Sequence, residues 1–208
     1  MLERGRRAGY LLAKAGSSLL LSLTGGVEIV GADLVPRRGP LILVANHQSL
    51  LDPLALMAAM PREITFLAAA YLFRLPVVGL VIRAVGAMPV RGEEGDLRSL
   101  RKSLALLREG KAIGLFPEGG VSRPGELRPF MPGWAYLALK SGAPVVPVIL
   151  YGSSKVLPAG AFIPRPGRIC IKVLPPVAFA PKKKIVQGDL ERLNTILRER
   201  FAERLAAE

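Results

Sequence analysis

The residues best suited to chemistry in this sequence are a histidine and an aspartate five positions apart. His47 is the only histidine among the 208 residues, and Asp52 follows it within the segment Asn-His-Gln-Ser-Leu-Leu-Asp-Pro at 46–53. A carboxylate that bonds to one imidazole nitrogen fixes the tautomer and leaves the other nitrogen to accept a proton. The pair therefore predicts a general base, His47, oriented by Asp52.

The same residues have an ordinary structural interpretation. A lone histidine is usually structural, and Pro53 suits the first position of a helix, which would make Asp52 its N-cap. Five residues of regular helix would turn the side chains of His47 and Asp52 about 140° apart. The pair can therefore meet only if the chain turns between the end of a strand and the start of a helix. Both roles of Asp52 can coexist, because a carboxylate has two oxygens.

The elements that must position this pair follow from the apolar pattern. Apolar strand candidates alternate with helical patterns at 27–31, 41–45, 64–67, 87–90, 112–116, 145–151 and 169–174. Such alternation is typical of a layered α/β fold. We expect residues 26–208 to form a single domain, with a mixed, mostly parallel central sheet flanked by helices.

Residues 1–25 are predicted to form an amphipathic, membrane-associated helix. The apolar segment 10–23 is interrupted by Lys14, Ser17 and Ser18 and is shorter than the roughly 20 residues that span a bilayer. We expect it to lie on a membrane; the alternative is a helix packed on the domain as core. The apolar stretch 71–85, broken by Pro76 and Gly79, is expected to form two short pieces, either membrane-facing or core.

The charge balance predicts an anionic partner. The chain carries 29 Lys and Arg against 16 Asp and Glu, half of its residues are hydrophobic, and only 6% are aromatic. A membrane surface fits this combination better than nucleic acid does. The lone Cys170 lies in an apolar alternation and is expected in the core, and the sequence offers no metal ligand set.

Longer motifs carry a resemblance to a known family. The segment 46–53 matches the His-x4-Asp signature of the glycerolipid acyltransferases, in particular the bacterial 1-acylglycerol-3-phosphate acyltransferases. Residues 116–130, Phe-Pro-Glu-Gly-Gly-Val-Ser-Arg-Pro-Gly-Glu-Leu-Arg-Pro-Phe, resemble the family's Phe-Pro-Glu-Gly-Thr-Arg-Ser-Arg-x-Gly-x-Leu-x-x-Phe block. Residues 86–91 resemble its Gly-x-x-x-x-Arg element, and 142–149 resemble its fourth block. The four elements occur in the family's order.

The resemblance implies where the substrates bind. Backbone N–H groups of a glycine-bearing loop can approach a phosphate, and an arginine can clamp it with paired hydrogen bonds. Glu118 is expected to orient these donors or the acyl acceptor. Where the family has Thr-Arg this chain has Gly120 and Val121, so a hydroxyl and a guanidinium are missing. We expect Arg123 to contribute more to phosphate binding as a result. The implied substrate-binding residues are Arg91, Glu118, Gly119, Gly120, Ser122 and Arg123.

The resemblance also implies a reaction. We expect transfer of a fatty acyl group from acyl carrier protein or coenzyme A to the sn-2 hydroxyl of 1-acylglycerol 3-phosphate, without an acyl-enzyme or a cofactor. The expected location is the cytoplasmic face of the cell membrane. The alternatives are another acceptor, such as glycerol 3-phosphate or a lyso-aminolipid, and a non-catalytic membrane-binding protein.

Overall fold

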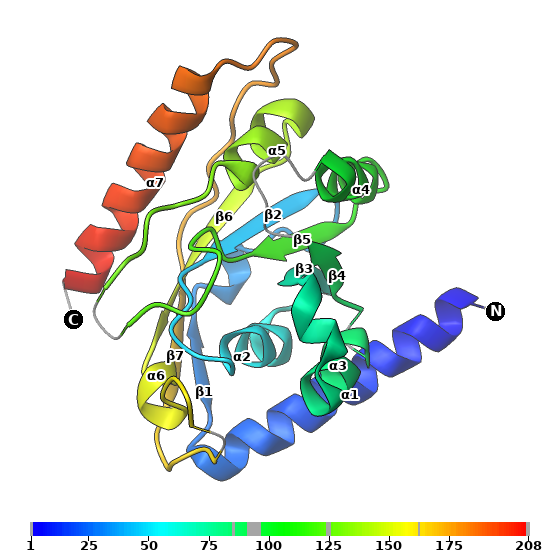
Figure 1. Ribbon diagram of the computed structural model, residues 1–208, viewed down its shortest axis with the longest axis vertical. Coiled ribbons are helices and arrows are strands. Elements are labelled where there is room, and N and C mark those ends of the chain that lie inside the picture. Colours follow the sequence, from blue (N-terminus) through cyan, green and yellow to red (C-terminus); the bar gives the residue numbers. More distant parts are fainter. Residues whose placement is uncertain (1, 85, 91–96, 124–125, 162, 207–208) are drawn as a thin grey trace.

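A mixed sheet crosses the middle of the computed structural model, which describes residues 2–84, 86–90, 97–123, 126–161 and 163–206 (Figure 1). Within these residues the strands are β1 (Val27–Val30), β2 (Leu41–Ala45), β3 (Ile64–Ala69), β4 (Met88–Val90), β5 (Ala112–Leu115), β6 (Val145–Tyr151) and β7 (Ile169–Val173). Their order is β1-β7-β6-β2-β5-β3-β4. The strands from β6 to β4 are parallel, whereas β7 is antiparallel to β6. The predicted strands and the mixed, mostly parallel sheet are confirmed.

Helices cover both faces of the sheet (Figure 1). They are α1 (Leu2–Thr24), η1 (Ala32–Leu34), α2 (Asp52–Ala59), η2 (Ala70–Arg74), α3 (Pro76–Ala84), α4 (Leu97–Arg108), α5 (Gly133–Ser141), α6 (Ser153–Val156) and α7 (Gln187–Ala206). Strand β2 is buried throughout, because Leu41 and Leu43 face the core with α1 and α2 while Ile42 and Val44 face the core with α4, α5 and α7. A parallel strand covered on both faces reads as a continuous apolar run.

Helix α1 is attached to the domain along one side and open along the other. Tyr10 and Leu21 are buried, and Lys14 donates a 2.6 Å hydrogen bond from Nζ to the Met60 carbonyl at the end of α2. Burial lowers the pKa of the Lys14 ammonium. Leu12 and Leu23, in contrast, are 75% and 78% exposed. Among the described residues, no helix is long and apolar enough to cross a membrane.

Two further expectations concern residues away from the centre of the sheet, the stretch 71–85 and Cys170. The stretch 71–85 does form two short pieces, η2 and α3, and each carries an exposed apolar side chain, Tyr71 and Leu80. Cys170 is only partly buried, so its placement in the core was wrong. It shares the less covered face of β7 with Lys172.

Candidate active site

The carboxyl ends of β2 and β5 bring two loops together. These strands are parallel neighbours, with Val44 opposite Leu115, so the segments that follow them leave the sheet at the same edge. The loop after β2 contains His47, and the loop after β5 contains Glu118. Ligand sites in open α/β sheets lie outside the carboxyl ends of the strands. The topology thus unites two motifs that are far apart in the sequence.

His47 and Asp52 form the hydrogen-bonded pair that their spacing predicts. His47 Nδ1 lies 2.9 Å from Asp52 Oδ2, and the aspartate is completely buried. A carboxylate can only accept, so the proton of the imidazole lies on Nδ1 and Nε2 keeps its lone pair. The His47 side chain is 14% exposed, which leaves the imidazole reachable from solvent. The pair has the geometry of a general base and its orienting group.

Asp52 is held by the backbone of the loop that it orients. Its Oδ2 also accepts hydrogen bonds from the N–H groups of Gln48 at 2.6 Å and Ser49 at 2.8 Å. The structural interpretation of Asp52 as an N-cap is wrong, because α2 begins at Asp52 and the N-cap position is Leu51, with no side-chain cap bond. Because the carboxylate faces back toward residues 47–49, the chain turns between strand and helix, as the meeting of the pair requires.

Asn46 attaches this loop to the neighbouring strand β6. Its side-chain amide donates to the Leu150 carbonyl at 3.0 Å, and its carbonyl oxygen accepts from the Leu150 N–H at 2.7 Å. Two bonds to one backbone position fix both the place and the rotation of a side chain that is fully buried. Sequence reasoning gave Asn46 no role, although its position directly before His47, at the end of an apolar strand, was the available signal.

Glu118 joins the two loops. Its Oε1 accepts the His47 N–H at 2.8 Å, and its Oε2 accepts the Ser122 hydroxyl and, at 3.0 Å, the Arg128 N–H. The side chain is only 3% exposed. Glu118 thus binds backbone N–H groups of both loops, and a role toward the phosphate donors or the acyl acceptor stays a prediction. A buried carboxylate with several charge-assisted bonds makes the arrangement of the two loops rigid.

The remaining predicted binding residues lie on the loop after β5, except one. Gly119 has φ +67°, a conformation that favours glycine, and it is exposed. Gly120 is partly exposed and Arg123 is exposed, whereas Ser122 is buried and donates its N–H to the His47 carbonyl at 2.7 Å. Ser122 is therefore part of the loop's internal bonding. Arg91 lies outside the described residues.

Phe116 covers one face of the His47 ring, and the sequence analysis missed it. The two ring centroids are 4.1 Å apart with an interplanar angle of 20°. Phe66 of β3 stacks behind Phe116 at 6.1 Å. Phe66 pairs with Gly114 of β5, where an added Cβ would lie 2.6 Å from the Phe66 ring. A glycine inside a strand marks such a close approach, so Gly114 was the signal in the sequence.

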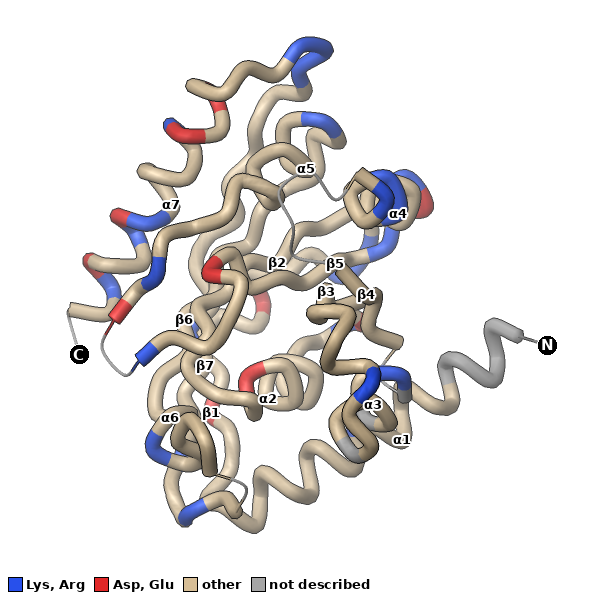
Figure 2. Tube along the Cα trace, in the orientation of Figure 1, with Lys and Arg blue, Asp and Glu red and all other residues tan. Residues whose placement is uncertain are grey.

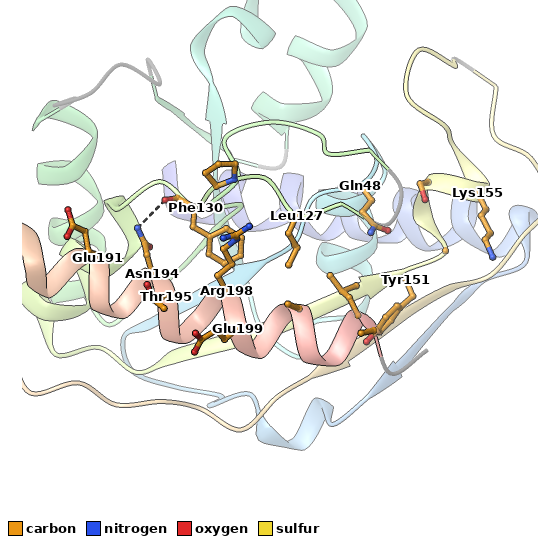
Figure 3. Close-up of a pocket in the computed structure, with 16 residues that line it drawn as sticks. Gln48, Leu127, Phe130, Tyr151, Lys155, Glu191, Asn194, Thr195, Arg198 and Glu199 are labelled. Atoms are coloured by element: carbon orange, nitrogen blue, oxygen red, sulfur yellow. Dashed lines mark hydrogen bonds between the residues drawn. The ribbon is translucent and has the colours of Figure 1, made fainter.

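A separate cavity of about 970 Å³ lies between α7, residues 127–130 and the end of β6 (Figure 3). Gln48, the residue after His47, lines it, and His47 does not. Lys155, Arg198 and Glu199 also line this cavity. Because Leu127, Phe130 and Leu205 line it as well, its walls are partly charged and partly apolar.

This chain resembles known proteins in sequence. The family model described as Acyltransferase matches residues 26–151. A 1-acyl-sn-glycerol-3-phosphate acyltransferase of Borreliella burgdorferi is 28% identical over 96% of this chain and 80% of its own length, and one of Bacillus subtilis is 27% identical over 91% and 96%. A chloroplast relative of Brassica napus is 30% identical over 75% of this chain, which spans about half, 46%, of that relative's length.

A solved structure resembles the whole chain. The crystal structure of the 1-acyl-sn-glycerophosphate (LPA) acyltransferase from Thermotoga maritima superposes with a TM-score of 0.80. The alignment covers all of this chain and 82% of that one, at 26% identity. The likeness therefore includes the N-terminal helix and the C-terminal helix as well as the two loops that carry His47 and Glu118.

Proposed function

The chain belongs to the acyltransferase family, and from that premise we propose that it transfers a fatty acyl group from a thioester donor to the free hydroxyl of 1-acylglycerol 3-phosphate, producing phosphatidic acid. The observation that carries the proposal is the 2.9 Å hydrogen bond between His47 Nδ1 and Asp52 Oδ2 at the meeting point of the two loops. The printed names of the bacterial relatives support the choice of acceptor.

The proposed reaction is a direct transfer. His47 Nε2 removes the proton of the acceptor hydroxyl as its oxygen attacks the thioester carbonyl, so that a C–O bond forms. The C–S bond then breaks, and the departing thiolate takes the proton from the imidazolium. Asp52 stabilises the imidazolium while this charge exists, and it holds the ring in place for the next cycle.

The proposed donor is acyl-coenzyme A or acyl carrier protein, and the reaction needs no cofactor. Both donors are anionic, and the chain has a net charge of +13. Figure 2 shows Lys and Arg gathered on α4, where Arg98, Arg101, Lys102 and Arg108 are exposed. Complementary charge accelerates encounter and is screened by salt, so we expect the rate at low donor concentration to fall as ionic strength rises.

The proposed location is the cytoplasmic face of the cell membrane, with an anionic bilayer as partner. Helices α1 and α3 lie side by side (Figure 1), and both carry apolar side chains that are exposed to solvent. The exposed apolar residues are Leu11, Leu12, Leu19, Leu20 and Leu23 of α1, Leu80 of α3, and Leu75 directly before α3. Exposed apolar surface of this kind is typical of an interaction site. A membrane that supplies a lysophospholipid is the matching partner.

A second acceptor is favoured by one observation. The loop after β5 carries Gly120 and Val121 where the family pattern has a hydroxyl and a guanidinium. Such a change lies in the segment expected to bind the acceptor's phosphate. Glycerol 3-phosphate or a lyso-aminolipid therefore belongs in the acceptor panel.

The experiment combines purified protein, lipid micelles, lysophosphatidic acid and a long-chain acyl thioester, and it counts both free thiol and phosphatidic acid. We expect wild type to form both products in equal amounts and His47→Ala to lose nearly all activity. The exposed Lys184→Ala variant is the matched control. A folded wild type that acylates no member of the panel would leave the membrane-binding protein as the better explanation.

Chemical modification provides an independent check on the base. Because His47 is the only histidine in the chain, diethyl pyrocarbonate can modify one imidazole at most. We expect activity to disappear as that ring is modified and to return with hydroxylamine. Loss of activity without modification of the imidazole would argue against His47 as the base.

A further inference from the structure

The Arg128 guanidinium lies next to Gly120, a position of the loop that has no side chain. The family pattern has Thr-Arg at the positions of Gly120 and Val121. A Cβ built on Gly120 would come within 2.6 Å of Arg128 Nη1. The absence of a side chain at position 120 is thus what allows the Arg128 guanidinium to lie against the loop.

The backbone holds Arg128 close to the loop that carries His47. The Arg128 N–H donates to Glu118 Oε2 at 3.0 Å, and Glu118 Oε1 accepts the His47 N–H at 2.8 Å. Next along the chain, the Met131 N–H donates to the Pro117 carbonyl at 2.7 Å. The segment before Met131 therefore folds back along residues 117–120. The place of the Arg128 Cα is set by the same carboxylate that positions the base.

The Arg128 guanidinium is available to a ligand. The side chain is exposed, and among the described residues no acidic side chain forms an ion pair with it. Guanidinium has a fork of donors that matches two oxygens of a phosphate. Arg123 is a second exposed arginine on the same loop.

We propose that Arg128 supplies the guanidinium that this loop lacks at position 121 and that it binds the phosphate of the acyl acceptor. This inference rests on the proposed function, whose acceptor carries a phosphate beside the reacting hydroxyl. A phosphate held here anchors the acceptor to the loop that also holds His47. Gly120 and Arg128 thus form a pair in which the first makes room for the second.

The first test is Arg128→Gln, which removes the charge and retains an amide. We expect KM for lysophosphatidic acid to rise on the order of tenfold, because a charge-assisted hydrogen bond is lost, and kcat to change little. Binding to micelles of lysophosphatidic acid without donor should weaken by a similar factor, and binding to monoacylglycerol micelles should not change. The matched control is Arg200→Gln, an equal charge change at an exposed site on α7.

A rescue experiment separates this role from a structural one. Gly120→Thr with Val121→Arg, made in the Arg128→Gln background, should recover much of the lost affinity for lysophosphatidic acid. Gly120→Ala alone should raise KM with little change in melting temperature, since the atom that must move is the end of a flexible side chain.

Three results would overturn the inference: an unchanged KM in Arg128→Gln, an equal rise in Arg200→Gln, or no recovery in the combined variant. Failure of the proposed function has a different signature, since wild type would then not acylate lysophosphatidic acid at all. In that event the micelle comparison decides the role of Arg128, because it requires no turnover.

Discussion

Replacing Gly114 by alanine tests how the sheet supports His47. The added methyl group would lie 2.6 Å from Phe66 Cε1 and 2.7 Å from Ile64 Cγ2. Both side chains are buried, Ile64 completely. Reaching ordinary contact at 3.4 Å requires the Phe66 ring to move by about 0.8 Å. The ring has little free space, because it stacks on Phe116, which in turn stacks on His47.

The expected magnitude follows from overpacking in a core. Inserting one methyl group costs about 1–3 kcal/mol in the free energy of unfolding, which for a chain of this size lowers the melting temperature by about 2–12 °C. Phe66 stacks on Phe116, which stacks on His47, so a shift of the Phe66 ring should also shift the imidazole. We therefore expect kcat to fall on the order of tenfold, because small displacements of a general base are costly. Urea unfolding followed by the single tryptophan, Trp134, measures the first quantity.

Two controls make the result decisive. Gly188→Ala on α7 places a methyl group with nothing within 4 Å, and it should leave kcat unchanged and stability equal or slightly higher. Gly114→Ala combined with Phe66→Leu should lose less than the sum of the two single variants, because the smaller side chain returns space. If Gly114→Ala has the stability and kcat of wild type, the account of the stacked rings is refuted.

Three further predictions concern the pair, the stacked ring and the C-terminal helix. Asp52→Asn should lower kcat on the order of a thousandfold with a smaller change in KM, as measured by steady-state kinetics, because an amide no longer fixes the His47 tautomer. Phe116→Leu should lower kcat roughly three- to tenfold, whereas Phe116→Tyr should retain most of it; equal rates in both variants would contradict a role for the aromatic face. The hydrogen bond from Lys182 lowers the pKa of Asp189 below the ordinary value of 3.8. The ionised carboxylate therefore adds stability that is fully present above pH 3.8 and is lost as the pH falls through the lowered pKa. In acid unfolding, Lys182→Met should reduce this loss of stability.

Much of the fold is local in origin and could be predicted. The buried strand 41–45 and the helix 97–108 follow from apolar runs and helical spacing, which depend on nearby residues only. The pairing of His47 with Asp52 was also within reach, because five residues and a proline leave few ways to turn. Asp52 as an N-cap was wrong because the backbone N–H groups of the loop, not those of the helix, bind its carboxylate.

The sequence by itself determined the strands, the longer helices, the pairing of His47 with Asp52 and the departure from the family pattern at Gly120 and Val121. Only the tertiary structure decided which distant groups complete the site. Glu118 reaches His47 across 71 positions, and Asn46 reaches Leu150 across 104, because parallel strands that are distant in the chain end side by side. The stack of Phe66 on Phe116 depends on strand order and register, which no local pattern encodes. The same holds for the contact of Arg128 with Gly120. The space left by the glycine is filled by the Arg128 guanidinium only because the chain folds back onto the loop.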